Sequence, residues 1–257
     1  MKNRRRRKKS PLSYQTRTYR RLVRSELVAS TVKVMETDLH IQASRNVVEA
    51  GLVLVTELRR QLEEYIRDHP GLRYSLVPLP LDPGAPELVI DMQKAGLRCG
   101  VGPMAAVAGA IAERVGQGLR SQGIDEVIVE NGGDLYLDRQ EDVTVAVYAG
   151  ESVLSGRVGL RIRADQMPCG VCCSSGTVGH SLSLGRADAV VAVAPSTALA
   201  DAAATRLGNE VRPGDINPCM DLARKLPGVT GVVVVQDQLL GVWGDLELIR
   251  LEPEQSG

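Results

Sequence analysis

The stretch VIVENGGDLYL, residues 127–137, places Asn131-Gly132-Gly133-Asp134 between two largely apolar runs. Asn-Gly and Gly-Gly supply the positive φ angles that two-residue hairpin turns need, so the stretch predicts two antiparallel strands joined by a tight turn. Glycine is also selected where a ligand approaches the backbone so closely that a Cβ would collide with it. The stretch alone therefore predicts a hairpin and leaves open whether a ligand lies against it.

Alternating and helical patterns extend outward from this hairpin. Strands are expected at 124–130 and 134–138, two or three more within 17–44, and others at 142–148, 157–163, 188–194, 230–235, 239–243 and 246–251. Helices are expected at 45–68, 86–96, 103–122, 196–209 and near 214–225, and a Cys/Ser/Gly loop at 166–179. No repeat or linker divides them. The order predicts one α+β domain over 13–257, with a largely antiparallel or mixed sheet and packed helices.

The charge is unevenly distributed along the chain. Lys and Arg together number 31, as do Asp and Glu, yet seven basic side chains and no acidic one lie within residues 1–9. Like charges without apolar partners cannot offset the entropy of ordering, so residues 1–12 are expected to be a disordered, dispensable basic tail. A tail of this kind can also bind nucleic acid or acidic lipid without specificity.

Composition excludes several classes of protein. Aromatic residues make up 3% and Phe is absent, which argues against a base-stacking nucleic-acid platform. No apolar run reaches the roughly 18–20 residues of a membrane helix, and no signal peptide is visible, so a cytoplasmic protein is expected. Five cysteines are an odd number, and Cys169-x-x-Cys172 lacks a second pair of ligands. We therefore expect neither a disulfide framework nor a zinc site.

Three further stretches could carry chemistry. CGVGPMAAVAGA, residues 99–110, is a glycine turn that opens a helix, which suits either a phosphate at the helix N-terminus or close packing through small residues. The Ser174–Gly179 loop could hold an anion or a ring edge, and His180 after it could move a proton or be structural. Asp201 and Thr205 lie four apart on one helical face, either as part of a Mg²⁺ site or facing solvent.

The order and the residue motifs of these stretches resemble those of the ApbE-like superfamily, known for FAD:protein FMN transferases. The resemblance runs over about residues 96–209 and is closest to a shorter, functionally uncharacterised branch. The shared motifs are ETDL, GVGPMAAVAGAIAE, VENGGD, SSGTVGHSLS, ADAVV and ADAAAT.

The resemblance implies FAD and Mg²⁺ as cofactors, and it assigns roles to residues of this chain. The cofactor-binding residues would be Gly102, Asn131, Gly132, Gly133, Asp134, Ser174, Ser175 and Gly176. Asp201, Thr205 and the carbonyl of Ala105 would bind the metal, and His180 would lie in the catalytic region. The chain departs from the transferases at Ala106, where they carry a lysine, and His180 is not followed by their Asp-Pro.

The sequence thus favours a flavin- or nucleotide-dependent enzyme that resembles Mg²⁺-dependent FAD:protein FMN transferases, which move FMN to a protein Thr or Ser. The alternative is a non-catalytic flavin- or nucleotide-binding module of the same fold. The expected partners are a flavin or adenine nucleotide and an acceptor protein, and a homo-oligomer is compatible with the sequence. A third interpretation places the function in the basic tail, with the domain docked on nucleic acid.

Overall fold

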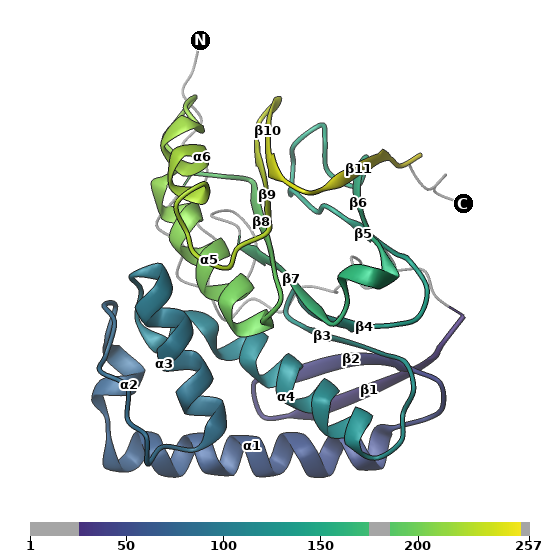
Figure 1. Cartoon of the computed structure of the whole chain (residues 1–257), viewed down its shortest axis with the longest axis vertical. Coiled ribbons are helices and arrows are strands. Elements are labelled where there is room, and N and C mark those ends of the chain that lie inside the picture. The colour runs from purple at the N-terminus through teal and green to yellow at the C-terminus, as the bar shows by residue number, and fades with distance from the viewer. Residues whose placement is uncertain (1–25, 175–185, 253–257) are drawn as a thin grey trace.

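The computed structural model describes residues 26–174 and 186–252, which form a layered α+β domain (Figure 1). Its centre is an eight-stranded sheet in the order β1-β2-β3-β4-β7-β8-β9-β10, and every neighbouring pair is antiparallel. The strands of this sheet are β1 (Val28–Val34), β2 (Thr37–Ala43), β3 (Val127–Asn131), β4 (Asp134–Asp138), β7 (Cys169–Ser174), β8 (Ala189–Ala194), β9 (Gly231–Gln236) and β10 (Leu239–Gly244).

A smaller sheet and a set of helices complete the domain. The smaller sheet has the order β11-β6-β5 and is also antiparallel, with strands β5 (Val143–Ala146), β6 (Val158–Ile162) and β11 (Glu247–Arg250). The helices are α1 (Val48–Asp68), α2 (Gly71–Tyr74), α3 (Glu87–Cys99), α4 (Val107–Ser121), α5 (Thr197–Glu210) and α6 (Asn217–Ala223). Two short 3₁₀ helices, η2 (Pro103–Ala106) and η3 (Ala164–Gln166), lie between them.

Strands β3, β4, β7, β8 and β9 of the central sheet are buried on both faces because their alternate side chains enter two different cores. Val127 and Val129 of β3 belong to the helix-side core, whereas Ile128 between them belongs to a second core with the small sheet. In β4, Tyr136 faces the helices while Leu135 and Leu137 face the small sheet. This arrangement explains why β8 (AVVAVA) and β9 (GVVVVQ) are apolar at nearly every position.

The helices cover one face of the central sheet (Figure 1). Helix α1 packs along β1, α4 packs on β3 and β4, and α5 packs on β7 and β8. Helix α3 contacts both α4 and α5, and α4 and α5 contact each other as well as the sheet.

Glycines allow α4 and α5 to lie unusually close to the sheet. A Cβ on Gly116 of α4 would be 2.2 Å from Cδ1 of Tyr136 on β4. A Cβ on Gly170 of β7 would be 2.3 Å from Cα of Thr197, the first residue of α5. The first turn of α5 therefore rests directly on the backbone of β7.

The predicted hairpin is present. Asn131 pairs with Asp134, and the two turn residues between them, Gly132 and Gly133, have φ angles of 70° and 108°. Non-glycine residues rarely adopt such angles. Both glycines are therefore explained by the turn itself, whether or not a ligand approaches it.

The predicted loop at 166–179 is wrong for part of its length. Residues Cys169–Ser174 are strand β7, in the middle of the central sheet. A strand buried on both faces shows no alternation, and its cysteines and glycine are small residues typical of loops as well as of crowded interiors. The other departures are minor: α2 was not expected, and the helix expected at 103–122 begins as η2. The expected basic tail at 1–12 lies outside the described residues.

The membrane prediction can be compared with the described helices. None of them is by itself long and apolar enough to cross a membrane. Only the pair Glu87–Cys99 and Pro103–Ser121 meets the requirement of length and composition together, and this pair is bent by 105°.

The contact between β7 and α5 predicts a specific destabilisation. Gly170→Ala places a methyl group against the backbone of Thr197, so we expect the free energy of unfolding to fall by about 1–3 kcal/mol. Urea denaturation measures this. Gly71→Ala is the matched control, because a Cβ there meets no atom within 4 Å, and we expect it to be neutral or slightly stabilising. A Gly170→Ala variant within about 0.5 kcal/mol of the parent protein would contradict the close approach.

Candidate functional site

The candidate site lies where α4 and α5 cross on the helix-covered face of the sheet. A Cβ on Gly109 of α4 would be 2.5 Å from the Thr197 carbonyl oxygen and 2.8 Å from Cβ of Asp201, both on α5. The crossing is thus a backbone-to-backbone contact through a glycine. Residues on either side of it are brought closer together than two helices with ordinary side chains would allow.

Asp201 caps the N-terminus of the neighbouring helix. The Gly109 amide donates a hydrogen bond of 2.9 Å to Oδ2 of Asp201, and no side chain of α4 itself caps that end. The first amides of a helix have no partner within the helix, so a carboxylate from another element satisfies them and interacts favourably with the helix dipole. The position of Asp201 is therefore tied to α4 as well as to its own helix.

Asp134, the last residue of the turn motif, lies beside Asp201. The two residues are 6% and 8% exposed, respectively, and Oδ1 of Asp134 is buried without a hydrogen-bond partner among the described residues. Burial raises the pKa of Asp134 well above its usual range, and the nearby charge of Asp201 raises it further. Burial likewise raises the pKa of Asp201 to about 7, although the amides of Gly109 and Ala108 oppose the shift. Burial disfavours the ionised form of both carboxyls, and ionisation of Asp201 further disfavours that of Asp134.

The hairpin turn is joined to the same helix end. Nδ2 of Asn131 donates to the carbonyl oxygen of Ala108 at 3.0 Å, and the Gly133 amide donates to Oε1 of Glu130 at 2.9 Å. A Cβ built on Gly132 or Gly133 would meet no atom of the described residues within 4 Å, so none of these residues covers the outer side of the turn. The turn is anchored on its inner side and leaves its glycine backbone accessible.

Strand β7 supplies the floor of the site. The Cys172 thiol donates to the Thr197 carbonyl oxygen at 3.4 Å, and burial, followed by the charge of Asp134, raises its pKa well above the usual range. Cys172 is therefore a neutral packing residue, and all five cysteines are free thiols. Oγ of Ser174 and Oγ1 of Thr197 are buried without partners among the described residues. Unpartnered buried hydroxyls are uncommon and are most informative where a ligand could reach them.

The structure describes nine of the twelve cofactor, metal and catalytic residues that the sequence indicated. Asn131, Asp134 and Ser174 lie on β3, β4 and β7, Asp201 and Thr205 lie on α5, and Gly132 and Gly133 form the turn between β3 and β4. Gly102 directly precedes η2, and Ala105 lies within η2. Ser175, Gly176 and His180 lie outside the described residues.

The glycine turn before α4 is a packing feature. A Cβ on Gly102 would be 1.8 Å from the Ser75 carbonyl oxygen, and the Gly102 amide donates to the carbonyl oxygen of Leu76 at 3.0 Å. Gly109 and the end of α4 are occupied by α5 and by Asp201. Of the two interpretations of this stretch, close packing is the one that the described contacts support. A phosphate would have to displace a carboxylate to bind the Gly109 amide.

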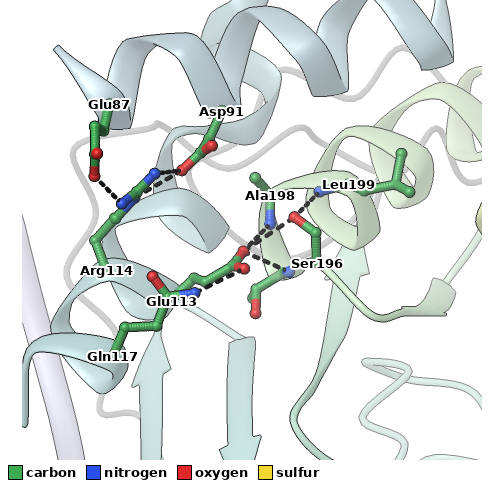
Figure 2. Close-up of polar contacts among 9 residues, drawn as sticks. Glu87, Asp91, Glu113, Arg114, Gln117, Ser196, Ala198 and Leu199 are labelled. Atoms are coloured by element: carbon green, nitrogen blue, oxygen red, sulfur yellow. Dashed lines mark hydrogen bonds and ion pairs between the residues drawn. The ribbon is translucent and has the colours of Figure 1, made fainter. Parts of the chain in front are cut away.

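Glu113 is an important residue that the sequence interpretation missed. Its Oε2 accepts hydrogen bonds from the Ser196 hydroxyl (3.0 Å) and from the amides of Thr197 (2.8 Å) and Ala198 (3.2 Å), at the start of α5 (Figure 2). A signal was available in the sequence: Glu113 is the one acidic residue of α4, and it lies four residues after Gly109 and three before Gly116. An acid on the small-residue face of a helix must find a partner in whatever packs there.

The donor set suits a hard divalent cation that takes few protein ligands. The described residues contain no group of three or more His, Cys, Asp or Glu side chains arranged to bind a metal. They do contain the buried Asp134–Asp201 pair, whose mutual repulsion a cation would relieve, and the unpartnered Oδ1 of Asp134. Mg²⁺ commonly uses one or two carboxylates and takes its other ligands from water and substrate phosphates. The residues present therefore fit such an ion.

Comparison with solved structures identifies the fold class. The domain is similar to the flavin transferase ApbE from Vibrio cholerae, with a TM-score of 0.56 and 16% identity over 85% of this chain and 96% of that one. It is also similar to the flavinyl transferase ApbE of Pseudomonas stutzeri, with a TM-score of 0.52 and 16% identity over 85% and 94% of the two chains. At this level of identity the likeness shows an ApbE-like fold.

Sequence comparison identifies the family. The family model described as AbpE bacteria matches residues 20–233. A UPF0280 protein of Methanococcus aeolicus is 37% identical over 226 residues, which cover 86% of this chain and 91% of that protein. Another from Methanosarcina acetivorans is 38% identical over 204 residues, or 79% and 80% of the two chains. The chain belongs to this AbpE bacteria family, whose relatives here are UPF0280 proteins. The resemblance to a shorter branch of the ApbE-like superfamily is confirmed.

The buried carboxylate pair predicts a stability that falls with pH. The pKa of Asp201 is about 7 in the folded protein and about 4 in an unfolded chain, so the folded state retains a proton that the unfolded state releases in this window. The free energy of unfolding should therefore decrease from pH 4 to pH 7 on account of this pair. Asp134→Asn removes the repulsion, and at pH 8 in EDTA we expect a gain on the order of 1–3 kcal/mol.

Asp138→Asn provides the control for this measurement. Asp138 lies on the same strand and face, but it forms an ion pair with Arg120 (2.8 Å), so its amide variant should be unchanged or slightly less stable. Thermal melts of the three proteins between pH 4 and pH 8 test the expectation. Parallel pH profiles for the parent protein and Asp134→Asn would show that the pair carries no electrostatic strain.

Proposed function

We propose that this protein binds a flavin or adenine nucleotide together with Mg²⁺ at the α4–α5 crossing, and that it transfers FMN from FAD to a protein hydroxyl. The observation that carries the proposal is the buried Asp134–Asp201 pair beside the open Gly132-Gly133 turn. A protein retains a destabilising pair of buried carboxylates where function requires it, and a cation–phosphate ligand is the chemistry that would relieve it. The fold shared with ApbE flavin transferases supports the same assignment.

Asp201 and Thr205, with the carbonyl oxygen of Ala105, would hold the ion. They lie on consecutive turns of α5 and on η2, which contacts α5. The bound cation would supply neutralisation of the pyrophosphate charge. Asp134, whose Oδ1 has no hydrogen-bond partner among the described residues, would complete the acidic wall of the site or accept a hydrogen bond from the nucleotide.

The proposed reaction is a phosphoryl-type group transfer. The hydroxyl oxygen of a Thr or Ser on the acceptor protein forms a bond to the phosphorus of the FMN moiety, and the bond from that phosphorus to the AMP oxygen breaks. AMP leaves with the electron pair, and the hydroxyl proton passes to a base, a role that we assign to His180. The Gly132-Gly133 backbone and the Ser174–Gly176 segment would orient the flavin and exclude water.

A second candidate is a flavin- or nucleotide-binding module without catalysis. The observation that favours it is Ala106, which stands where transferases have a lysine and is completely buried. No cationic side chain is available at that position to stabilise a leaving phosphate. Release of AMP from FAD separates the two candidates, because a binding module releases none.

Ligand titration tests the site itself. We expect FAD, ATP or ADP to bind with a dissociation constant below about 1 mM, roughly −4 kcal/mol, in calorimetric titrations with Mg²⁺. Asp201→Asn keeps an oxygen for the Gly109 amide but removes the charge, and it should weaken binding at least about tenfold in Mg²⁺ while leaving binding in EDTA unchanged. Thr205→Val should act in the same direction.

Asp221→Asn serves as the control, because Asp221 is an exposed residue of α6 paired with Arg224. It should bind like the parent protein. If none of the three nucleotides binds, the proposed function is wrong. If one binds and Asp201→Asn retains its full Mg²⁺ dependence, the metal assignment is wrong and the nucleotide site lies elsewhere.

A further inference from the structure

The N-terminus of α5 is held by a residue of the neighbouring helix. A single oxygen, Oε2 of Glu113, accepts hydrogen bonds from the Ser196 hydroxyl and from the amides of Thr197 and Ala198 (Figure 2). Ser196 is also the local cap of α5, accepting from the Leu199 amide at 3.4 Å. Glu113 therefore acts on α5 through bonds that a local cap cannot make, because they join it to another helix.

Helix α4 is itself firmly attached on the other side. Arg114, the residue after Glu113, forms ion pairs with Asp91 (2.6 Å) and Glu87 of α3 (Figure 2). Nε2 of Gln117 donates to Oε1 of Glu113 at 3.3 Å, which helps to orient the carboxylate. Glu113, which holds the start of α5, therefore lies on a helix that is itself attached to α3.

The second contact between α4 and α5 lies one turn away on each helix. Gly109 is four residues before Glu113, and Asp201 is four residues after Thr197, and these two are joined by the 2.9 Å bond from the Gly109 amide to Asp201. Each helix therefore supplies the carboxylate that caps the other. Two contacts, one turn apart, determine both the position of α5 along the axis of α4 and the angle between the two helices. A single contact would allow α5 to pivot about it.

We propose that Glu113 is a positioning residue for Asp201: by holding the first turn of α5 against α4, it determines where the Asp201 carboxylate lies relative to Gly109 and Asp134. Loss of this contact changes the site although Glu113 touches none of its residues that would bind a ligand. The position of the Glu113 oxygen, rather than its charge, is what the three hydrogen bonds require.

Hydrogen exchange at the Gly109 amide tests the inference without any ligand. Glu113→Asp shortens the side chain by one methylene and withdraws the oxygen, so exchange at Gly109 should accelerate at least about tenfold, measured by NMR under conditions where local opening dominates. Glu113→Ala should accelerate it at least as much. Glu113→Gln presents an oxygen at the same place and should stay within about threefold of the parent protein.

Ser196→Ala is the matched control for stability. It removes the local cap of α5 but leaves both backbone bonds to Glu113, so exchange at Gly109 should stay close to that of the parent protein even if α5 frays. Equal acceleration in Ser196→Ala and Glu113→Asp, or none in Glu113→Asp, would overturn the inference. If Glu113→Ala does not fold, the contrast between Glu113→Asp and Glu113→Gln still decides it.

A second readout rests on the proposed function. Glu113→Asp should weaken Mg²⁺-dependent nucleotide binding about tenfold and leave binding in EDTA unchanged, whereas Glu113→Gln and Ser196→Ala should bind like the parent protein. Failure of the parent protein to bind any nucleotide would refute the proposed function, and exchange at Gly109 would still decide the role of Glu113. Normal Mg²⁺ dependence in a Glu113→Asp variant that exchanges fast at Gly109 would show that the contact does not serve the site.

Discussion

The reciprocal capping of α4 and α5 is the constraint on which the rest of the site depends. Every helix begins with amides that have no partner inside the helix. Here Asp201 of α5 serves the start of α4, and Glu113 of α4 serves the start of α5. Asp201 is buried, Glu113 is half-buried, and the amides of Gly109, Thr197 and Ala198 that they cap belong to buried residues. Neither helix can therefore move without leaving buried amides unpaired, which is costly.

Close packing through glycine makes this capping geometrically possible. Gly109 lets the backbones of the two helices touch, and Gly170 lets α5 rest on β7. The hairpin turn then joins the same point through the bond from Asn131 to the Ala108 carbonyl. Asp134 is thereby brought within the electrostatic influence of Asp201: burial raises the pKa of both carboxyls, and the charge of Asp201 raises that of Asp134 further. The close packing of α4, α5 and β7 stabilises the domain, and the same packing buries the two carboxyls in surroundings that disfavour their ionised forms.

Two groups of similar proteins support conclusions at two levels, the family and the fold. The UPF0280 proteins at 37% and 38% identity establish the family, while the ApbE transferases at 16% identity share the fold. A fold can carry several chemistries, so the activity has to be argued from side chains in the site. In this chain the buried carboxylates are Asp134 and Asp201, which we propose as part of the site together with Thr205 and the glycine turn, and Ala106 is buried.

The sequence by itself determined what depends on neighbours along the chain. Gly132 and Gly133 specified the hairpin, the helical periodicity specified α1, and the Gly208-Asn209 stop indicated the end of α5 to within about a residue. The spacing of Asp201 and Thr205 placed them on successive turns. Tertiary structure alone decided that Cys169–Ser174 is a central strand, because burial on both faces erases the alternation that marks a strand. It also decided the partners of Glu113 and Asp134. The partners of Glu113 lie 83 to 85 residues further along the chain, and the charge that acts on Asp134 is that of Asp201. Such contacts depend on which elements pack together, and no local sequence pattern records this.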